Sequence, residues 1–242
     1  MKETFLGSCL RCGKSLTRGQ SVRRNAAEYC ARCAKYVTEF KHGPWPKKRV
    51  DWILPGPDIG RLGQELLETI SRARDERPIQ VFLEKNPWFL VQLFGYGHGR
   101  WVFPRPRLGS EHIPDFMVCG QDSAGPYWHL IELESPTRSV LRNDGQPRAA
   151  FTHASQQISD WRVWLRKHGQ YAQSELGYTG LDDEFQGIII MGRRSHLRTE
   201  HRERYRELSR GGLEVMSYDR LSEQVLGATE FWREILRRSG KS

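Results

Sequence analysis

The stretch between residues 108 and 138 constrains the fold of this chain more than any other, because it reads as two β-strands joined by a turn. Residues 113–119 and 127–134 have the composition of strands, and glycine, proline and polar residues that favour turns separate them. Successive side chains of a strand point to opposite faces, so Glu132 and Glu134 share a face. The sequence therefore predicts a hairpin with two carboxylates on one face of its second strand.

Two carboxylates on one strand face are unfavourable, because like charges repel and the burial of a charge destabilises the fold. A divalent cation held by Asp115 and Glu132, which would come from adjacent strands, removes this conflict. An acidic face turned toward solvent removes it as well. The residues alone leave the metal site and the solvated face open.

The dipeptide Pro114-Asp115, followed by Glu132-Leu133-Glu134 at the end of the next apolar strand, resembles the PD-(D/E)xK signature of restriction-endonuclease-like nucleases. Further segments, by their order and spacing, resemble the C-terminal domain of the Shedu (SduA) anti-phage nucleases, over roughly residues 78–225. The segments that carry this second resemblance are 82–88, 152–161, 188–194 and 214–221.

The resemblance implies an α/β fold with a restriction-endonuclease-like mixed central sheet flanked by helices, and the order of helical and strand-like segments agrees with it. It also implies a metal-dependent endonuclease that hydrolyses phosphodiester bonds in DNA, in anti-phage defence. In such an enzyme Asp115, Glu132 and the Leu133 carbonyl would hold Mg²⁺ or Mn²⁺, which lowers the pKa of a bound water. Members of the family assemble into oligomers, so we expect a homo-oligomer.

Two further residues gain a role from the resemblance. Glu84, near the end of the helix that precedes the sheet, would add a carboxylate to the metal site. Gln157, together with His153, would approach the metal-binding strands from the helix that begins near Thr152. The alternative for Glu84 is an ordinary solvated glutamate, and for Gln157 it is a buried amide that satisfies backbone groups.

The chain departs from the family at Glu134, where most members have a lysine. An ionised glutamate accepts hydrogen bonds but cannot donate them. Glu134 could act as a base or a metal ligand, or Lys85 could supply the ammonium group from another element. The alternative is a non-catalytic nucleic-acid-binding or sensor protein with a degenerate nuclease fold.

A separate module is expected at residues 1–45, because two Cys-x-x-Cys pairs lie there. Four thiolates around a tetrahedral zinc ion would fold a segment with almost no apolar core, as in zinc-ribbon or treble-clef-like modules. A redox pair or disulfides are the alternatives, and the module could contact nucleic acid or protein. The pairs are Cys9 with Cys12 and Cys30 with Cys33.

Beyond this module we expect a proline-rich linker at residues 46–57 and the nuclease-like domain at residues 58–242. The fifth cysteine, Cys119, lies in an apolar strand and is expected in the core.

The net charge of +9 favours a polyanionic partner, and DNA is the expected one. The chain has neither an apolar run long enough to span a membrane nor the apolar core of a signal peptide, so we expect a cytoplasmic protein without a membrane partner. A zinc-bearing protein-interaction adaptor, which would bind DNA weakly and with little dependence on salt, is a further possibility. The expected phosphate contacts are Arg105, Arg107, Arg193 and Arg194.

Overall fold

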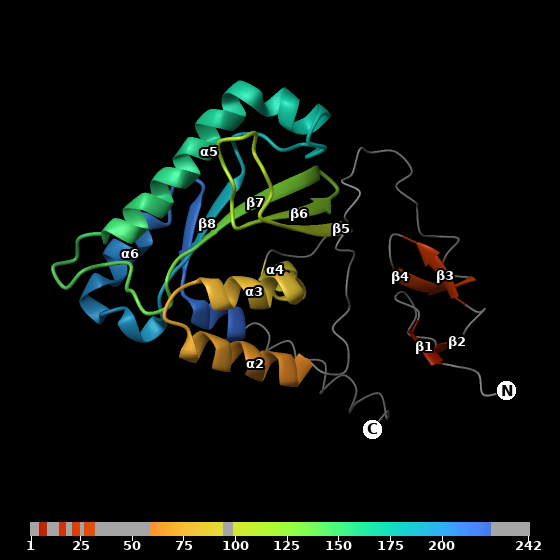
Figure 1. Ribbon diagram of the computed structural model, residues 1–242, viewed down its shortest axis with the longest axis horizontal. Coiled ribbons are helices and arrows are strands. Elements are labelled where there is room, and N and C mark those ends of the chain that lie inside the picture. Colours follow the sequence, from red (N-terminus) through yellow and green to blue (C-terminus); the bar gives the residue numbers. More distant parts are fainter. Residues whose placement is uncertain are drawn as a thin grey trace.

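The computed structural model of the protein describes residues 5–8, 15–17, 21–24, 27–31, 59–93 and 99–223. Within these ranges a five-stranded sheet lies between two layers of helices (Figure 1). The strands are β5 (Gly99–Pro104), β6 (Phe116–Asp122), β7 (Gly125–Leu133), β8 (Gln186–Ile190) and β9 (Leu213–Met216). The helices of this part are α2 (Ile59–Arg72), α3 (Arg77–Lys85), α4 (Trp88–Leu93), α5 (Ala149–Ser174) and α6 (Arg202–Leu208).

The strands lie side by side in the order in which they occur in the chain. β5, β6 and β7 are antiparallel neighbours, whereas β7, β8 and β9 are parallel. The ends of β5, β7, β8 and β9 and the start of β6 therefore meet at one edge of the sheet, which we call the C-terminal edge. Helix α5 makes the crossover that the parallel pair β7 and β8 requires. The predicted mixed sheet flanked by helices is confirmed.

Each face of the sheet has its own hydrophobic core. One core joins α2, α3 and α4 to residues such as Val118 and Ile131. The other joins α5 and α6 to the intervening residues of the same strands, such as Cys119 and Leu130. Neighbouring residues of β7 thus belong to opposite cores, as the alternation in the sequence predicts.

The β6–β7 hairpin is tighter than the sequence predicts. A turn is expected over residues 120–126, but the ladder continues to the pair Asp122 and Gly125 and leaves only Ser123 and Ala124 between them. The Asp122 carboxylate accepts a hydrogen bond from the Ala124 N–H at 2.7 Å, and Gly125 has a φ of 125°. These two features make a short turn where the composition indicates a longer loop.

Two helices also differ from the sequence expectation. The short helix α4 lies in a segment whose interleaved aromatic and basic residues give no clear helical period. Helix α5 continues to Ser174, although the composition of the chain from residue 169 onward is polar and typical of a loop. It passes through the non-helical residue His168, whose ring lies 5.0 Å from that of Trp164, and the fully buried Ala172 anchors its last turns on the core.

Two antiparallel hairpins make up the described N-terminal part. They pair β1 (Phe5–Ser8) with β2 (Ser15–Thr17), and β3 (Ser21–Arg24) with β4 (Ala27–Cys30). Strand β1 contacts β4, and Leu16 is fully buried. Of the predicted zinc ligands, Cys30 ends β4, whereas Cys9, Cys12 and Cys33 lie outside the described residues, as does the predicted linker.

Among the helices that the structure describes, none combines the length and the apolar character that a membrane crossing requires.

Arg162 of α5 holds the edge of the sheet opposite the C-terminal edge. Its guanidinium donates hydrogen bonds to the carbonyls of Phe185, Gly211 and Gly212 at 3.2, 3.2 and 2.7 Å. Arg162→Ala would leave these carbonyls without that donor, so we expect the free energy of unfolding to fall by about 2 kcal/mol.

Arg166→Ala is the matched control, because it removes an exposed ion pair with Asp183 one turn further along α5. This change is expected to lower the free energy of unfolding by less than about 1 kcal/mol. Urea denaturation measures both values, and equal losses in the two variants would contradict the role given to Arg162.

Candidate active site

Two carboxylates meet at the C-terminal edge, on the adjacent strands β6 and β7. The antiparallel register of the β6–β7 ladder, continued by one residue, sets Asp115 opposite Glu132. The Asp115 carboxylate accepts a hydrogen bond from the Leu133 N–H at 2.9 Å and another from Gln80 Nε2 at 3.3 Å. The fold thus brings together the two residues that the sequence singles out as metal ligands.

Burial acts strongly on the titration of this pair. It raises the pKa of Asp115 from 3.8 to about 6, although the hydrogen bond from the Leu133 N–H opposes the rise. Burial, followed by the charge of Asp115, raises the pKa of Glu132 from 4.5 to about 9. Because the two carboxyls interact, their protons leave in steps that belong to the pair. Without a cation the pair therefore keeps a proton at neutral pH.

Gln157 of α5 lies beside this pair and donates a hydrogen bond to the Glu132 carboxylate. Glu132 Oε2 and Gln157 Oε1 are buried, and neither has a hydrogen-bond partner among the described residues. Buried polar atoms nearly always have a partner, so two neighbouring exceptions need an explanation such as a bound ion. The structure therefore places the predicted glutamine at the site, with an oxygen atom available to a ligand.

Glu134 completes what we call the carboxylate cluster, which consists of Asp115, Glu132 and Glu134. Glu134 follows β7 directly and is half-buried, and burial, followed by the charge of Glu76, raises its pKa. The charge of Glu76 also adds to the rise that burial causes in the pKa of Asp115 and of Glu132. The charge of Glu76 therefore raises the pKa of all three carboxylates of the cluster.

Glu76 is a residue that the sequence analysis misses. It is the N-cap residue of α3 and precedes Gln80 by four residues, while Glu84 follows Gln80 by four. Residues at this spacing share one face of a helix, so the pattern Glu-x₃-Gln-x₃-Glu is a signal that the sequence contains. The face of α3 that carries the predicted Glu84 does meet the cluster. The acidic residue with the larger effect on Asp115 is Glu76, at the start of the helix.

The residues expected from the end of α3 lie further out. Glu84 is exposed, and its charge contributes the last of the effects named for the pKa of Asp115, after burial and the charge of Glu76. Lys85, considered as a source of an ammonium group, is exposed as well.

Two arginines and a histidine act on the titration of the cluster. Arg105 opposes the rise that burial causes in the pKa of Asp115, and His153 and Arg138 oppose the corresponding rise for Glu134. These three side chains come from the end of β5, the start of α5 and the loop after β7, and each favours the ionised form of a carboxylate of the cluster.

The backbone of Arg105 is strained. Its φ of 47° lies in the left-handed region, which residues other than glycine rarely adopt. The Arg105 N–H donates to the Asp115 carbonyl at 2.8 Å, so the strained residue is tied to the backbone of the first residue of the cluster. Strain of this kind is concentrated at functional sites. Both Arg105 and the nearby Arg107 have exposed side chains, as phosphate contacts require.

The donor atoms at the site fit a hard cation. In the part of the chain that the structure describes, no group of three or more His, Cys, Asp or Glu side chains is arranged to hold a metal ion by itself. Asp115, Glu132 and Gln157 instead offer two carboxylates and an amide oxygen, with two buried oxygen atoms lacking partners. Mg²⁺ is commonly held by one or two carboxylates and completed by water and substrate phosphates.

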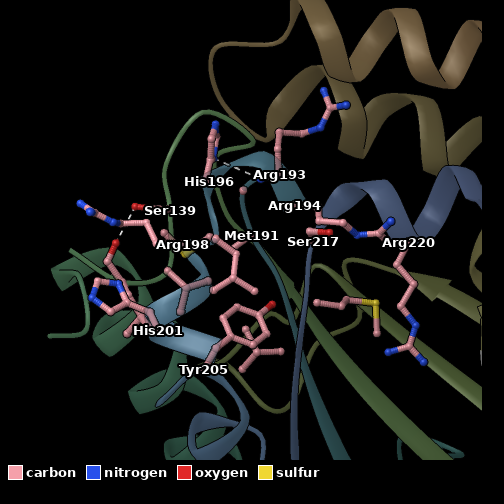
Figure 2. A pocket seen from close by; sticks show the side chains of 16 residues that line it. Ser139, Met191, Arg193, Arg194, His196, Arg198, His201, Tyr205, Ser217 and Arg220 are labelled. Atoms are coloured by element: carbon pink, nitrogen blue, oxygen red, sulfur yellow. Dashed lines mark hydrogen bonds between the residues drawn. The ribbon is translucent and has the colours of Figure 1, made fainter. Parts of the chain in front are cut away.

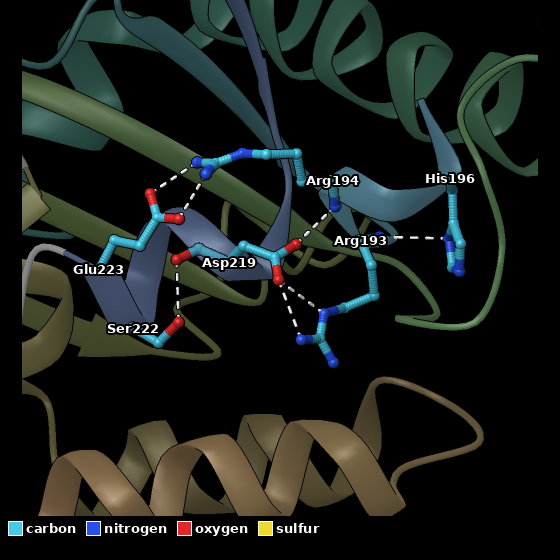
Figure 3. Close-up of polar contacts among 6 residues, drawn as sticks. All are labelled: Arg193, Arg194, His196, Asp219, Ser222 and Glu223. Atoms are coloured by element: carbon cyan, nitrogen blue, oxygen red, sulfur yellow. Dashed lines mark hydrogen bonds and ion pairs between the residues drawn. The ribbon is translucent and has the colours of Figure 1, made fainter. Parts of the chain in front are cut away.

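Arg193 and Arg194 follow β8 at the same edge and form ion pairs there (Figure 3). The Arg193 guanidinium donates to the Asp219 carboxylate at 3.0 Å, and that of Arg194 donates to Glu223 at 2.6 Å. A phosphate group at either arginine would have to compete with a carboxylate that is already bound.

A cavity of about 200 Å³ opens beside these arginines, where β8 and β9 end next to α6. Figure 2 shows Met191 and Tyr205 near its middle, while the side chains of Arg193 and Arg220 extend away from it. No member of the carboxylate cluster lines this cavity. The cluster and the cavity are therefore separate features of one edge.

Two comparisons with known proteins bear on the family of this chain. The comparison with curated proteins finds none that matches it. The family model described as "Shedu protein SduA, C-terminal" matches residues 73–222. This segment is more than half of the chain and contains Glu76, Gln157 and the whole carboxylate cluster. The chain therefore belongs to the family of the Shedu protein SduA C-terminal domain.

Proposed function

We propose that this chain is a metal-dependent nuclease that hydrolyses phosphodiester bonds in DNA. The observation that carries the proposal is the largely desolvated pair Asp115 and Glu132, which destabilises the fold unless a proton or a cation neutralises it. Strongly perturbed carboxyls of this kind are concentrated at functional sites. Family membership suggests a role in anti-phage defence, and the net charge of +9 suits a DNA partner.

Asp115, Glu132 and the Gln157 amide oxygen would hold Mg²⁺ or Mn²⁺, with the Leu133 carbonyl as the ligand that the family resemblance adds. Such an ion, when bound, polarises the scissile phosphate and lowers the pKa of a bound water. The chain's own contribution is orientation. Gln80 and the Leu133 N–H fix the Asp115 carboxylate, and the Gln157 amide fixes that of Glu132.

Glu134 takes the place of the family's lysine, and its surroundings suit a general base. Burial raises its pKa, and a carboxylate with a raised pKa is the stronger base near neutral pH. In this role Glu134 accepts the proton of the attacking water. His153 and Arg138 favour its ionised form, and the exposed Arg105 would bind a phosphate of the DNA.

Cleavage of linear, supercoiled and single-stranded DNA, and of RNA, with and without Mg²⁺ or Mn²⁺, tests this proposal. We expect DNA products only when the metal is present. Tight binding without products in any metal would contradict the nuclease and favour the second candidate, a non-catalytic sensor, which the replacement of lysine by Glu134 supports. Weak binding that depends little on salt would favour the adaptor.

We also propose that Cys9, Cys12, Cys30 and Cys33 bind one structural zinc ion, on the strength of their spacing. The purified protein should contain about one zinc per chain, and Cys30→Ser should lose most of it. Cys119→Ser is the control, because Cys119 is buried in the sheet. Elemental analysis measures both variants, and an unchanged zinc content in Cys30→Ser would contradict the site.

A homo-oligomer and a cytoplasmic location stay predictions.

A further inference from the structure

A hydroxyl network joins the loop after β7 to the connection between α2 and α3. Ser135 directly follows Glu134, and it is only 7% exposed. Its hydroxyl donates to the Arg74 carbonyl at 2.9 Å. The Thr137 hydroxyl lies 2.9 Å from that of Ser135 and 3.3 Å from the same carbonyl. Two side chains from the end of β7 thus converge on one backbone oxygen of a distant segment.

This oxygen lies two residues before Glu76. The connection that contains Arg74 carries Glu76 into the start of α3, and one turn later Gln80 donates to Asp115. Glu76 has the same charge as the carboxylate cluster, so repulsion favours a connection that swings outward. The hydroxyl network holds the connection from the β7 side against this repulsion.

Ser135 is itself well fixed, which makes it a suitable anchor. Its carbonyl accepts a hydrogen bond from the Gly192 N–H at 3.2 Å, and the preceding Glu134 N–H donates to the Ile190 carbonyl at 2.9 Å. Ser135 is therefore tied to the end of β8 through the backbone and to Arg74 through its side chain.

We propose that Ser135 and Thr137 are positioning residues, which hold Glu76 against the carboxylate cluster through the Arg74 carbonyl. The consequence for cation binding rests on the proposed function, because Glu76 then adds negative charge beside the ion. The positioning itself is a property of the metal-free protein and can be measured without catalysis.

A double-mutant cycle tests the positioning in zinc-loaded protein without Mg²⁺ or Mn²⁺. Glu76 makes no side-chain hydrogen bond as N-cap, so Glu76→Gln removes its charge without removing a cap bond. Any attraction between Glu76 and the helix N-terminus is expected to be equal in the wild-type and Ser135→Ala backgrounds. We therefore expect the Tm shift caused by Glu76→Gln to be more positive in the wild-type background than in Ser135→Ala, by roughly 2 °C or more.

Ser222→Ala is the matched control background. Ser222 is 4% exposed and its hydroxyl donates to the Asp219 carbonyl at 2.9 Å, so the change removes a similar buried hydrogen bond elsewhere. Glu76→Gln should shift Tm in Ser222→Ala as in the wild type. Equal shifts in all three backgrounds would overturn the proposal. If Ser135→Ala does not fold, Thr137→Ala replaces it as the background, because Thr137 is exposed. A less positive Tm shift from Glu76→Gln in that background supports the proposal, and an equal shift overturns it.

Calorimetric titration with Mn²⁺ tests the consequence. We expect Ser135→Ala and Glu76→Gln each to weaken Mn²⁺ binding by roughly 10-fold, and the double variant to be little weaker than either, whereas Ser222→Ala binds as the wild type does. Losses that multiply in the double variant would overturn the link between Ser135 and Glu76. A wild-type protein that binds no Mn²⁺ would contradict the proposed function, and the Tm cycle would still decide the positioning.

Discussion

Glu132→Gln is expected to lower the rate of Mg²⁺-dependent DNA cleavage by roughly 10²- to 10³-fold. The substitution keeps the shape of the side chain and an oxygen that can accept the hydrogen bond from Gln157, but it removes the negative charge that a cation requires. Asp115→Asn should have an effect of similar size, because its amide oxygen can still accept the Leu133 N–H. Initial rates on one linear DNA at saturating Mg²⁺ measure both variants.

Glu184→Gln is the control for the change in net charge. Glu184 is exposed and precedes β8, at the edge of the sheet opposite the carboxylate cluster. The Glu184→Gln variant should cleave DNA at the wild-type rate. If Glu132→Gln and Asp115→Asn cleave as fast as Glu184→Gln, the cluster has no part in catalysis.

In the metal-free protein the contribution of Asp115 and Glu132 to stability is expected to fall as the pH rises. The pKa of Glu132 is about 9 in the folded protein and 4.5 ordinarily, so between these values the folded state keeps a proton that the unfolded state has released. The contribution of Glu132 to stability is therefore highest below pH 4.5 and falls toward pH 9. Asp115, with a pKa raised from 3.8 to about 6, adds to the fall at the acidic end. The total contribution of the pair is on the order of a few kcal/mol.

Urea denaturation at pH 5, 7 and 9 in Mg²⁺-free buffer measures this loss. Glu132→Gln should flatten the pH dependence, because its side chain does not titrate, whereas Glu184→Gln should follow the wild type. Adding Mg²⁺ at pH 9 should restore stability to the wild type and have little effect on Glu132→Gln. Parallel pH profiles of the wild type and Glu132→Gln would contradict the raised pKa of Glu132.

Much of the fold and half of the site follow from local patterns in the sequence. The alternation of residues in β7 predicts which face Glu132 occupies, because period-2 burial leaves little freedom once both faces are covered. The pair of strands with Asp115 at the start of one and Glu132 at the end of the next predicts their meeting, since an antiparallel register fixes both positions.

The remaining members of the site depend on long-range packing. Glu76 lies in a charged connection, and its helical spacing from Gln80 and Glu84 becomes informative only once the docking of α3 through Gln80 onto Asp115 is known. Ser135 gives no signal either, because its partner is a backbone carbonyl 61 residues away. The same limit applies to Arg138, which acts on the titration of Glu134 from the loop after β7, whereas His153 is expected at the site from the family resemblance.

The central claim is that Asp115 and Glu132 hold a divalent cation, and direct titration of Mn²⁺ into the zinc-loaded protein tests it best. The account predicts a Mn²⁺ site in the wild type and in Glu184→Gln that is lost or weakened at least roughly 100-fold in Glu132→Gln and in Asp115→Asn. Equal Mn²⁺ binding by all four proteins would contradict it.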